Sequence, residues 1–214
     1  MNVKQLIEQI GLRAFGIESP TEIDRQIYLD LLNTVHFELY RKTATISPYV
    51  EETFIKGEIA EGERFPLPYL FLDKMPFLIK RVLAKDRTLK QTQLGKILEK
   101  DPRLSATSDP EYWGLFSKNL FIYPAYDGDI YIYAIEDAAP FKEDTREQEI
   151  PYPTMYHDIL VDGCVAKTLS TEGGLKHSKE AEYAHIRWTK GYNELYQYYL
   201  SVTGEKSSST YSTI

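Results

Sequence analysis

The sequence predicts an α+β fold in which a helical bundle frame is interrupted by an inserted antiparallel β region. Apolar residues recur at helical spacing in 1–45 and again in 151–203, so we expect two helices from each end of the chain. Between them, residues 46–150 are rich in tyrosine and proline, and parts of this region alternate with the period of a strand. The polar, serine-rich residues 204–214 have too few apolar side chains to fold alone, and we expect a flexible tail there.

The two N-terminal helices are predicted from spacing and capping patterns. Residues 2–15 form a short first helix, which a glycine ends. Ser19 is the expected N-cap of a long second helix, with Pro20 at its first position and Glu22 completing a capping box. Apolar residues then repeat every four positions, and we expect the face that they form to be buried: Ile23, Ile27, Leu31, Val35 and Leu39.

The β region contains one strong hairpin signal. The turn sequence Asp127-Gly128-Asp129 separates two alternating runs, so we expect strands at 120–123 and 130–135 to pair across it. An earlier strand at 113–116 joins the first of these through a three-residue turn, and 77–84 forms a further strand.

The C-terminal helices are predicted at 156–171 and 177–202. The pair Gly173-Gly174 ends the first of them, because glycine adopts the left-handed conformation that closes a helix. The second extends about 39 Å at 1.5 Å per residue. The preceding residues 137–148 are charged, and we expect them to be exposed.

Composition excludes several classes of protein. The net charge of −7 and the isoelectric point near 5.2 disfavour a general nucleic-acid-binding surface, which would be basic. The single cysteine, Cys164, rules out an internal disulfide framework. No apolar run approaches the ~20 residues that span a bilayer, and the first residues do not resemble a secretion signal. We therefore expect a soluble protein that is made in the cytoplasm and has no membrane contact.

No motif predicts catalysis. His157 and Cys164 are seven residues apart, and His177 and His185 are eight apart, whereas a helical zinc site needs a spacing of three or four. Acidic residues are plentiful, but they lie in charged loops where carboxylates are usually solvated. We therefore expect no catalytic residue, no cofactor and no metal, and hence no enzyme. The alternative left open is a small soluble hydrolase with a dispersed carboxylate site.

Three stretches together resemble one protein family. The first is a short helix ahead of a longer helix that contains Leu31-Leu32-Asn33. The second is an aromatic pair followed by an apolar strand that ends at Pro124 and a tyrosine-rich return strand at 130–133. The third is Pro151-Tyr152-Pro153 ahead of the apolar run 156–166 and the terminal aromatic helix. In these patterns the chain resembles the head–tail connector adaptors of tailed bacteriophages.

The resemblance, which leaves out roughly residues 49–109, implies a non-enzymatic structural protein of the virion. Such adaptors form a homo-oligomeric, typically dodecameric, ring that docks on the portal protein and receives the tail or nozzle protein. Packaged DNA passes through the lumen without specific binding, and an acidic wall would repel its phosphates. A head-closure stopper or a tail-completion protein shares this ring role and is the close alternative.

Tyrosine is frequent, with 17 among 214 residues, and it suits both strands and protein interfaces. Aromatic residues of the last helix and of the return strand are therefore candidates for partner binding: Trp188, Tyr192, Tyr131 and Tyr133. The resemblance adds tail residues that become ordered on a neighbour or on the portal: Glu205, Lys206, Tyr211 and Ile214. The alternatives are ordinary core or strand roles for the aromatic residues and a solvated tail with no partner.

Overall fold

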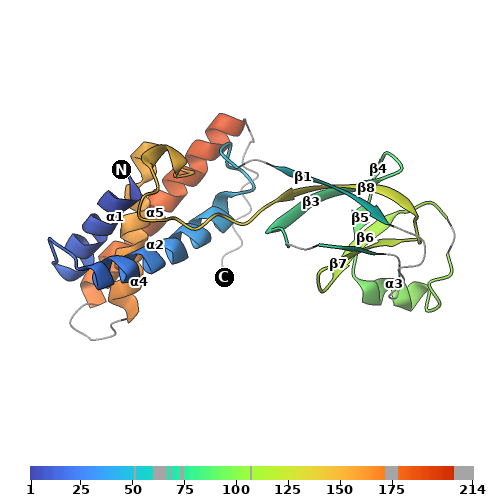
Figure 1. Cartoon of the computed structure of the whole chain (residues 1–214), viewed down its shortest axis with the longest axis horizontal. Coiled ribbons are helices and arrows are strands. Elements are labelled where there is room, and N and C mark those ends of the chain that lie inside the picture. The colour runs from blue at the N-terminus through green and yellow to red at the C-terminus, as the bar shows by residue number, and fades with distance from the viewer. Residues whose placement is uncertain are drawn as a thin grey trace. The chain divides into compact units, whose positions relative to one another are not determined.

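The chain folds into two compact units, one helical and one built of strands (Figure 1). The computed structural model describes residues 1–50, 52–59, 67, 69–72, 75–106, 108–171 and 178–204. The helical unit consists of Met1–Val50 and Asp137–Ile214, and the strand unit of Glu51–Glu136. The protein is therefore α+β, as predicted, with the strands inserted between helices of one unit.

The first helical segment confirms the N-terminal prediction and adds a detail to it. Helix α1 (Val3–Ile10) begins with a capping box, in which the backbone N–H of Gln5 donates to Asn2 Oδ1 at 2.9 Å. The chain continues as one π-helical turn, Gly11–Phe15, and ends at Gly16, whose φ of 67° is left-handed. The widened turn is not visible in the spacing of apolar residues.

Helix α2 (Glu22–Thr43) begins two residues later than we expected. The sequence holds two overlapping capping patterns, and the structure uses the second instead of the one at Ser19. Thr21 Oγ1 accepts from the N–H of Asp24 at 3.3 Å, and the Asp24 carboxylate accepts from the N–H of Thr21 at 2.9 Å. The Thr21 hydroxyl also donates to the Asp24 carboxylate at 2.7 Å, and this bond together with the one from the Thr21 N–H lowers the pKa of Asp24, because both stabilise its charged form.

The buried face of α2 also differs from the predicted one. Its buried apolar residues are Tyr28, Leu32, Val35 and Leu39, whereas the side chains of Ile23 and Ile27 are 75% and 54% exposed. A row with a constant spacing of four residues winds about 160° around a helix over 16 residues, since each step advances about 40° beyond a full turn. The predicted row therefore leaves the core towards its N-terminal end, and the prediction was wrong for the two isoleucines.

Helices α4 (Asp158–Thr171) and α5 (Ser178–Thr203) form the centre of the helical unit. Two glycines bring them close together. A Cβ on Gly163 of α4 would lie 2.8 Å from Trp188 Nε1, and a Cβ on Gly191 of α5 would lie 2.8 Å from Ile159 Cγ1. Each helix thus offers a glycine where the other presents a large side chain.

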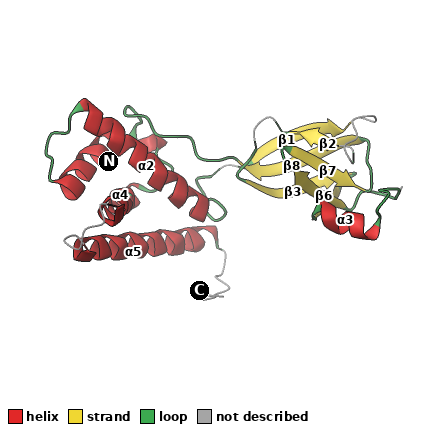
Figure 2. Ribbon diagram, turned by 90° about the horizontal axis from the view of Figure 1, so that it is seen from below, coloured by secondary structure: helices red, strands yellow, loops and turns green. Residues whose placement is uncertain are grey.

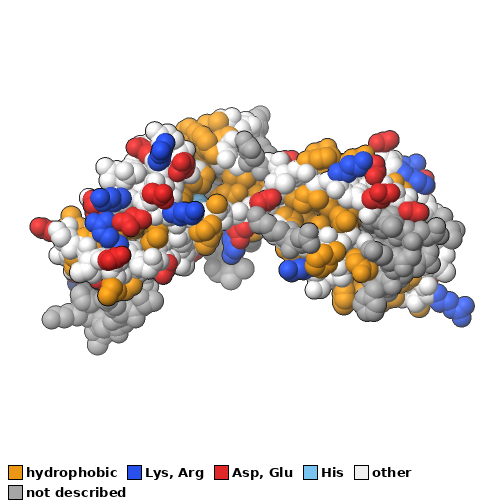
Figure 3. All heavy atoms as spheres, viewed as in Figure 1, with side chains coloured by type: hydrophobic (Ala, Val, Ile, Leu, Met, Phe, Trp, Pro, Cys, Tyr) orange, Lys and Arg blue, Asp and Glu red, His pale blue; other side chains and the backbone are white. Residues whose placement is uncertain are grey.

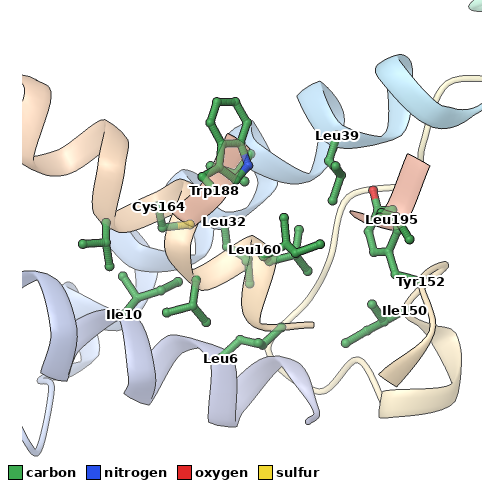
Figure 4. Close-up of a cluster of buried hydrophobic side chains, with 14 of the residues drawn as sticks. Leu6, Ile10, Leu32, Leu39, Ile150, Tyr152, Leu160, Cys164, Trp188 and Leu195 are labelled. Carbon is green, nitrogen blue, oxygen red and sulfur yellow. The ribbon is translucent and has the colours of Figure 1, made fainter. Parts of the chain in front are cut away.

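The core of the helical unit joins all four α-helices (Figure 4). Helix α4 packs against α1, α2 and α5. The close-up shows side chains from each helix converging on α4, with Cys164 among them. The fully or almost fully buried members include Leu6, Ile10, Leu32, Leu39, Leu160, Cys164, Leu195 and Tyr199.

The segment after the strands belongs to the helical unit, although we placed residues 46–150 in the β region. The side-chain amide of Asn33 bonds the backbone of Phe141 twice, accepting at 2.7 Å and donating at 3.1 Å. Arg41 pairs with Asp137, and Phe141 and Ile150 are buried in the helical core. Residues 137–150 therefore form a strap over α2, and the strand unit itself spans Glu51–Glu136.

The strand unit consists of two four-stranded sheets packed face to face (Figure 2). One sheet has the order β1-β8-β3-β4 and the other β2-β7-β6-β5, with antiparallel pairs except β5–β6. A short helix, α3 (Leu94–Lys100), follows β5. The strands are β1 (Thr53–Ile59), β2 (Tyr69–Phe71), β3 (Leu78–Ala84), β4 (Arg87–Thr88), β5 (Lys90–Gln91), β6 (Tyr112–Phe116), β7 (Asn119–Tyr123) and β8 (Gly128–Ile135). Buried side chains from both sheets form one cluster, which includes Val82, Trp113, Ile122 and Ile132.

The predicted hairpin around Gly128 was wrong. Strand β7 pairs with β2 and β6, whereas β8 lies between β1 and β3 in the other sheet, so the intervening residues carry the chain from one sheet to the other. Both strands alternate because each presents one face to the shared core, and an Asp-Gly pair suits any sharp change of direction. The predicted hairpin between β6 and β7 is confirmed, with Trp113 opposite Ile122.

We predict that Gly163→Ala destabilises the fold. The added methyl group would lie 2.6 Å from Val35 Cγ1 as well as against Trp188, so these side chains or the helices that carry them must shift. The expected loss in the free energy of unfolding is about 1–3 kcal/mol, measured by urea denaturation. Gly95→Ala on α3 is the matched control, since nothing lies within 4 Å of its added Cβ. It is expected to raise stability by about 0.5–1 kcal/mol, and equal effects at the two sites would contradict the close approach.

We predict that Asn33→Ala releases the strap from α2. The change leaves both the N–H and the carbonyl of Phe141 without their side-chain partner, which costs about 1–3 kcal/mol for a buried polar group. Urea denaturation and the rate of proteolysis within 137–150 measure the effect. Thr34→Ala, one residue along on the exposed side of α2, is the control and should change stability by less than about 0.5 kcal/mol. Unchanged protection of the strap in Asn33→Ala would show that other contacts hold it.

Candidate functional site

The described part of the chain offers no cluster of potential metal ligands. No group of three or more His, Cys, Asp or Glu residues within it is placed to hold a metal ion. The Cys164 thiol is fully buried, and burial raises its pKa, so the thiolate needed for nucleophilic chemistry is disfavoured. Exposed surfaces are the other candidates for a functional site.

Two buried histidines have structural roles around one tyrosine. A neutral His36 ring donates from Nε2–H to the carbonyl of Ala139 at 3.2 Å and accepts at Nδ1 from the Tyr152 hydroxyl at 2.9 Å. The ring also stacks on Phe141 with centroids 3.9 Å apart. His157 donates from Nε2 to the carbonyl of Tyr152 at 3.0 Å. The His36 ring therefore fastens the strap to α2, and the His157 ring holds the backbone of Tyr152.

Burial sets the ionisation of both histidines. It lowers the pKa of His36 from 6.5 to about 4, because the charged ring would lose its hydration. The pKa of His157 is lowered as well, again mainly by burial. Both rings are buried and hydrogen-bonded within the helical unit, so both serve the fold.

An open groove runs along the exposed side of α5. Its volume is about 930 Å³, and its lining comes from α5 and from Tyr156 just ahead of α4. Tyr156 and Tyr198 contact each other at one side, with ring centroids 5.6 Å apart. Ile186 and Lys190 line the groove too, and the Ile186 side chain is 52% exposed. The groove is mainly apolar and suits another protein surface better than a small polar ligand.

A second exposed apolar surface lies at the start of α2. Ile23 and Ile27 are one turn apart on the helix and are both exposed. They are accompanied by Asp30, which accepts a hydrogen bond from Gln26 at 2.9 Å. We call Ile23, Ile27 and Asp30 the α2 ridge. Figure 3 shows that hydrophobic side chains reach the surface of the helical unit on the face in view.

A third surface lies on the outer face of the sheet that contains β8. Phe54 of β1 packs against Tyr131 and Tyr133 of β8, with ring centroids 5.7 and 5.4 Å apart. We call these three residues the aromatic face. The Arg81 guanidinium lies 4.3 Å from the centre of the Tyr133 ring, and Lys56 pairs with Asp129 at 2.8 Å. The opposite side of β8, with Ile130 and Ile132, is fully buried.

The predicted partner-binding residues are placed in three different settings. Tyr131 and Tyr133 lie together on the aromatic face. Trp188 is 8% exposed and belongs to the helical core, where Lys42 Nζ lies 4.7 Å from its ring, and Tyr192 lies beside the same lysine at 5.5 Å. The tail candidates Glu205, Lys206, Tyr211 and Ile214 lie outside the described residues.

Sequence reasoning missed the residues that dominate the exposed apolar surface. Ile23 and Ile27 were assigned to a buried face, and Ile186, Tyr183 and Phe54 were not singled out. A signal was present on α5, because Tyr183 and Ile186 lie on the same side of the helix as polar residues that follow them. That side faces solvent. For Phe54 the sequence carries no comparable sign, since only its pairing opposite Tyr133 brings the aromatic rings together.

Comparisons with known proteins add no relative. The chain matches no protein-family model, and no curated protein is significantly similar to it. Among the described residues, no helix is long and apolar enough to cross a membrane.

We predict that His36 makes stability depend on pH in a defined window. Its pKa is about 4 in the folded chain and near 6.5 when unfolded, so the unfolded state binds the proton more tightly. The contribution of the neutral ring is fully present above about pH 6.5 and is lost as the pH falls towards 4, with a slope of up to about 1.4 kcal/mol per pH unit.

Urea denaturation between pH 7 and pH 4 measures this slope, with His36→Gln as the comparison. The glutamine variant keeps the titrating carboxylates and His157, so their contributions cancel in the difference between the two proteins. The variant should show the shallower slope between about pH 6.5 and pH 4. Parallel curves for the two proteins would contradict the assignment.

Proposed function

We propose that this chain is a structural subunit of a viral particle that works by binding copies of itself and other proteins. The observation that carries the proposal is the exposed apolar surface of the helical unit. Ile23, Ile27, Tyr183, Ile186 and Val202 are each more than half exposed. Large apolar side chains that are exposed on a folded surface favour a role in protein association.

Within that class, we propose a head–tail connector adaptor of a tailed bacteriophage, a ring subunit that joins the portal to the tail or nozzle. The resemblance of the capped helix pair, the tyrosine-rich strands and the Pro151-Tyr152-Pro153 segment supports this choice. The helical unit supplies the frame of the ring, and the segments before and after the strand unit both contribute to it. The inserted strand unit supplies a docking surface. The net charge of −7 suits a wall past which DNA moves without binding.

The aromatic face is the best-supported docking surface of the strand unit. It combines three aromatic rings with the Arg81 guanidinium, and aromatic residues and arginine are the side chains most enriched at binding hot spots. A head-closure stopper or a tail-completion protein would use the same surfaces and differs in which neighbour it touches.

A hydrolase is less well supported by the described residues. The titratable side chains of the α5 groove include His185, Lys190 and Glu194, which are exposed to solvent. A general acid or base needs a setting that perturbs its pKa towards the working pH, and such a setting is usually enclosed. The groove is instead open and mainly apolar, which favours a structural role.

The test is binding to the portal protein encoded with this chain. We expect the purified chain to co-sediment with assembled portal and to appear as an added ring in electron micrographs. An unrelated portal is the control and should sediment without it. A chain that never binds the portal, at any concentration tested, would contradict the adaptor role. Self-association in solution is measured separately, because assembly on the portal as a template is compatible with a monomeric free chain.

A further inference from the structure

Two exposed surfaces of the helical unit each place a charged residue seven positions after a first apolar residue. On the α2 ridge, Ile23 is followed by Ile27 after four residues and by Asp30 after seven. On α5, Tyr183 is followed by Ile186 after three residues and by Lys190 after seven, and we call these three residues the α5 row. Each set therefore places two apolar side chains and then a charge along about 10 Å of helix.

The pattern of exposure shows that both sets face solvent. The apolar members are 75% and 54% exposed on the ridge and 63% and 52% exposed on the row. Helices α2 and α5 both pack on α4, and their buried faces are formed by other residues, such as Leu32 and Leu195. Neither set is needed to complete the core of its own chain.

The spacings suit direct helix packing. In the commonest near-parallel arrangement, a ridge of residues three apart on one helix fits a groove between residues four apart on the other. The α2 ridge begins with a four-residue step and the α5 row with a three-residue step. The row also borders the groove of about 930 Å³, since Ile186 and Lys190 line it, so there is room for the isoleucines of a partner.

The charges at the end of each set are opposite. Asp30 closes the α2 ridge and Lys190 closes the α5 row, each seven residues after the first apolar member. When the two helices run parallel with Ile23 beside Tyr183, Asp30 comes opposite Lys190. Within one chain Lys190 lies 3.8 Å from Glu194, a long and exposed ion pair that is easily exchanged for another.

We propose that the α2 ridge of one copy packs into the α5 row and groove of a second copy of this chain. The contact joins two different surfaces, so it is heterologous and leaves a free ridge at one end and a free row at the other. Repetition of such a contact closes into a ring when the rotation between copies allows it. The interface rests on the proposed ring function and specifies which side chains form it.

Charge reversal tests the contact. Asp30→Lys and Lys190→Asp each place like charges together, and each is expected to weaken self-association about tenfold or more in analytical ultracentrifugation. The double variant, Asp30→Lys with Lys190→Asp, restores the opposite pair and should recover most of the loss. Lys96→Asp, an exposed change on α3 of the strand unit, is the control and should leave self-association unchanged.

Cross-linking supplies an independent measurement, because it reports which residues of the two copies lie close together. Ile27→Cys in one preparation and Ile186→Cys in another should form a disulfide-linked dimer on mixing and oxidation, while the native Cys164 is buried and does not contribute. Val202→Cys is the matched control on α5, because it is similarly exposed but lies 16 residues, or about 24 Å, further along the helix. Equal cross-linking of Ile186→Cys and Val202→Cys with Ile27→Cys would overturn the proposal.

The outcomes separate this interface from the function on which it rests. Measurements are made with the chain alone and on its portal. Assembly that is unaffected by both charge reversals and gives no Ile27–Ile186 cross-link overturns this contact and leaves the ring intact. A native chain that forms no oligomer under either condition overturns both. Loss in each single variant with recovery in the double variant supports the contact directly.

Discussion

The close approach of α4 and α5 is the constraint on which the helical unit depends. It depends on a glycine on each helix, Gly163 facing Trp188 and Gly191 facing Ile159, and a larger residue fits neither position unless its neighbours shift. The tight contact places α4 at the centre, where it also packs against α1 and α2. Because α4 covers the inner faces of its neighbours, apolar side chains on the outer faces of α2 and α5, such as Ile23 and Ile186, remain exposed.

The strap, residues 137–150, is likewise held in place by a few specific contacts. Its own apolar residues are few, so it is fixed by hydrogen bonds to α2 and by two anchors, Phe141 and Ile150, in the core. The neutral His36 ring and the Tyr152 hydroxyl satisfy each other there, which allows two polar groups to be buried at little cost. Ionisation of His36 would leave a buried charge, and this couples the strap to acidity.

The sequence predicted the helices and strands better than it predicted which of them pack or pair with one another. The helices and most strands follow from local periodicity, which short-range sterics and burial impose. The start of α2 was predicted two residues too early, because the capping pattern at Ser19 was chosen and the structure uses the one at Thr21. The burial of Ile23 and the pairing of β8 were wrong, since both depend on which neighbour covers a face, and the neighbour is set by tertiary packing.

The candidate surfaces could be predicted from the sequence only in part, again because burial depends on tertiary packing. Tyr131 and Tyr133 were proposed as candidates because tyrosine suits protein interfaces, but their neighbour Phe54 lies almost 80 residues earlier in the sequence. Trp188 was predicted as a binding residue from its aromatic neighbours, and Gly163, which gives it room in the core, lies on another helix. Local patterns identify apolar side chains, and only the fold shows which of them remain uncovered.

The chain enters the strand unit through β1 and leaves it through β8, and these two strands pair with each other. Thr53 at the start of β1 is directly opposite Ala134 near the end of β8, so the two chain crossings are neighbours. An insertion with adjacent ends can be lengthened, shortened or exchanged during evolution without altering the spacing of the flanking helices. The packing of the helical unit can therefore stay the same while the inserted strand unit changes in length or in surface.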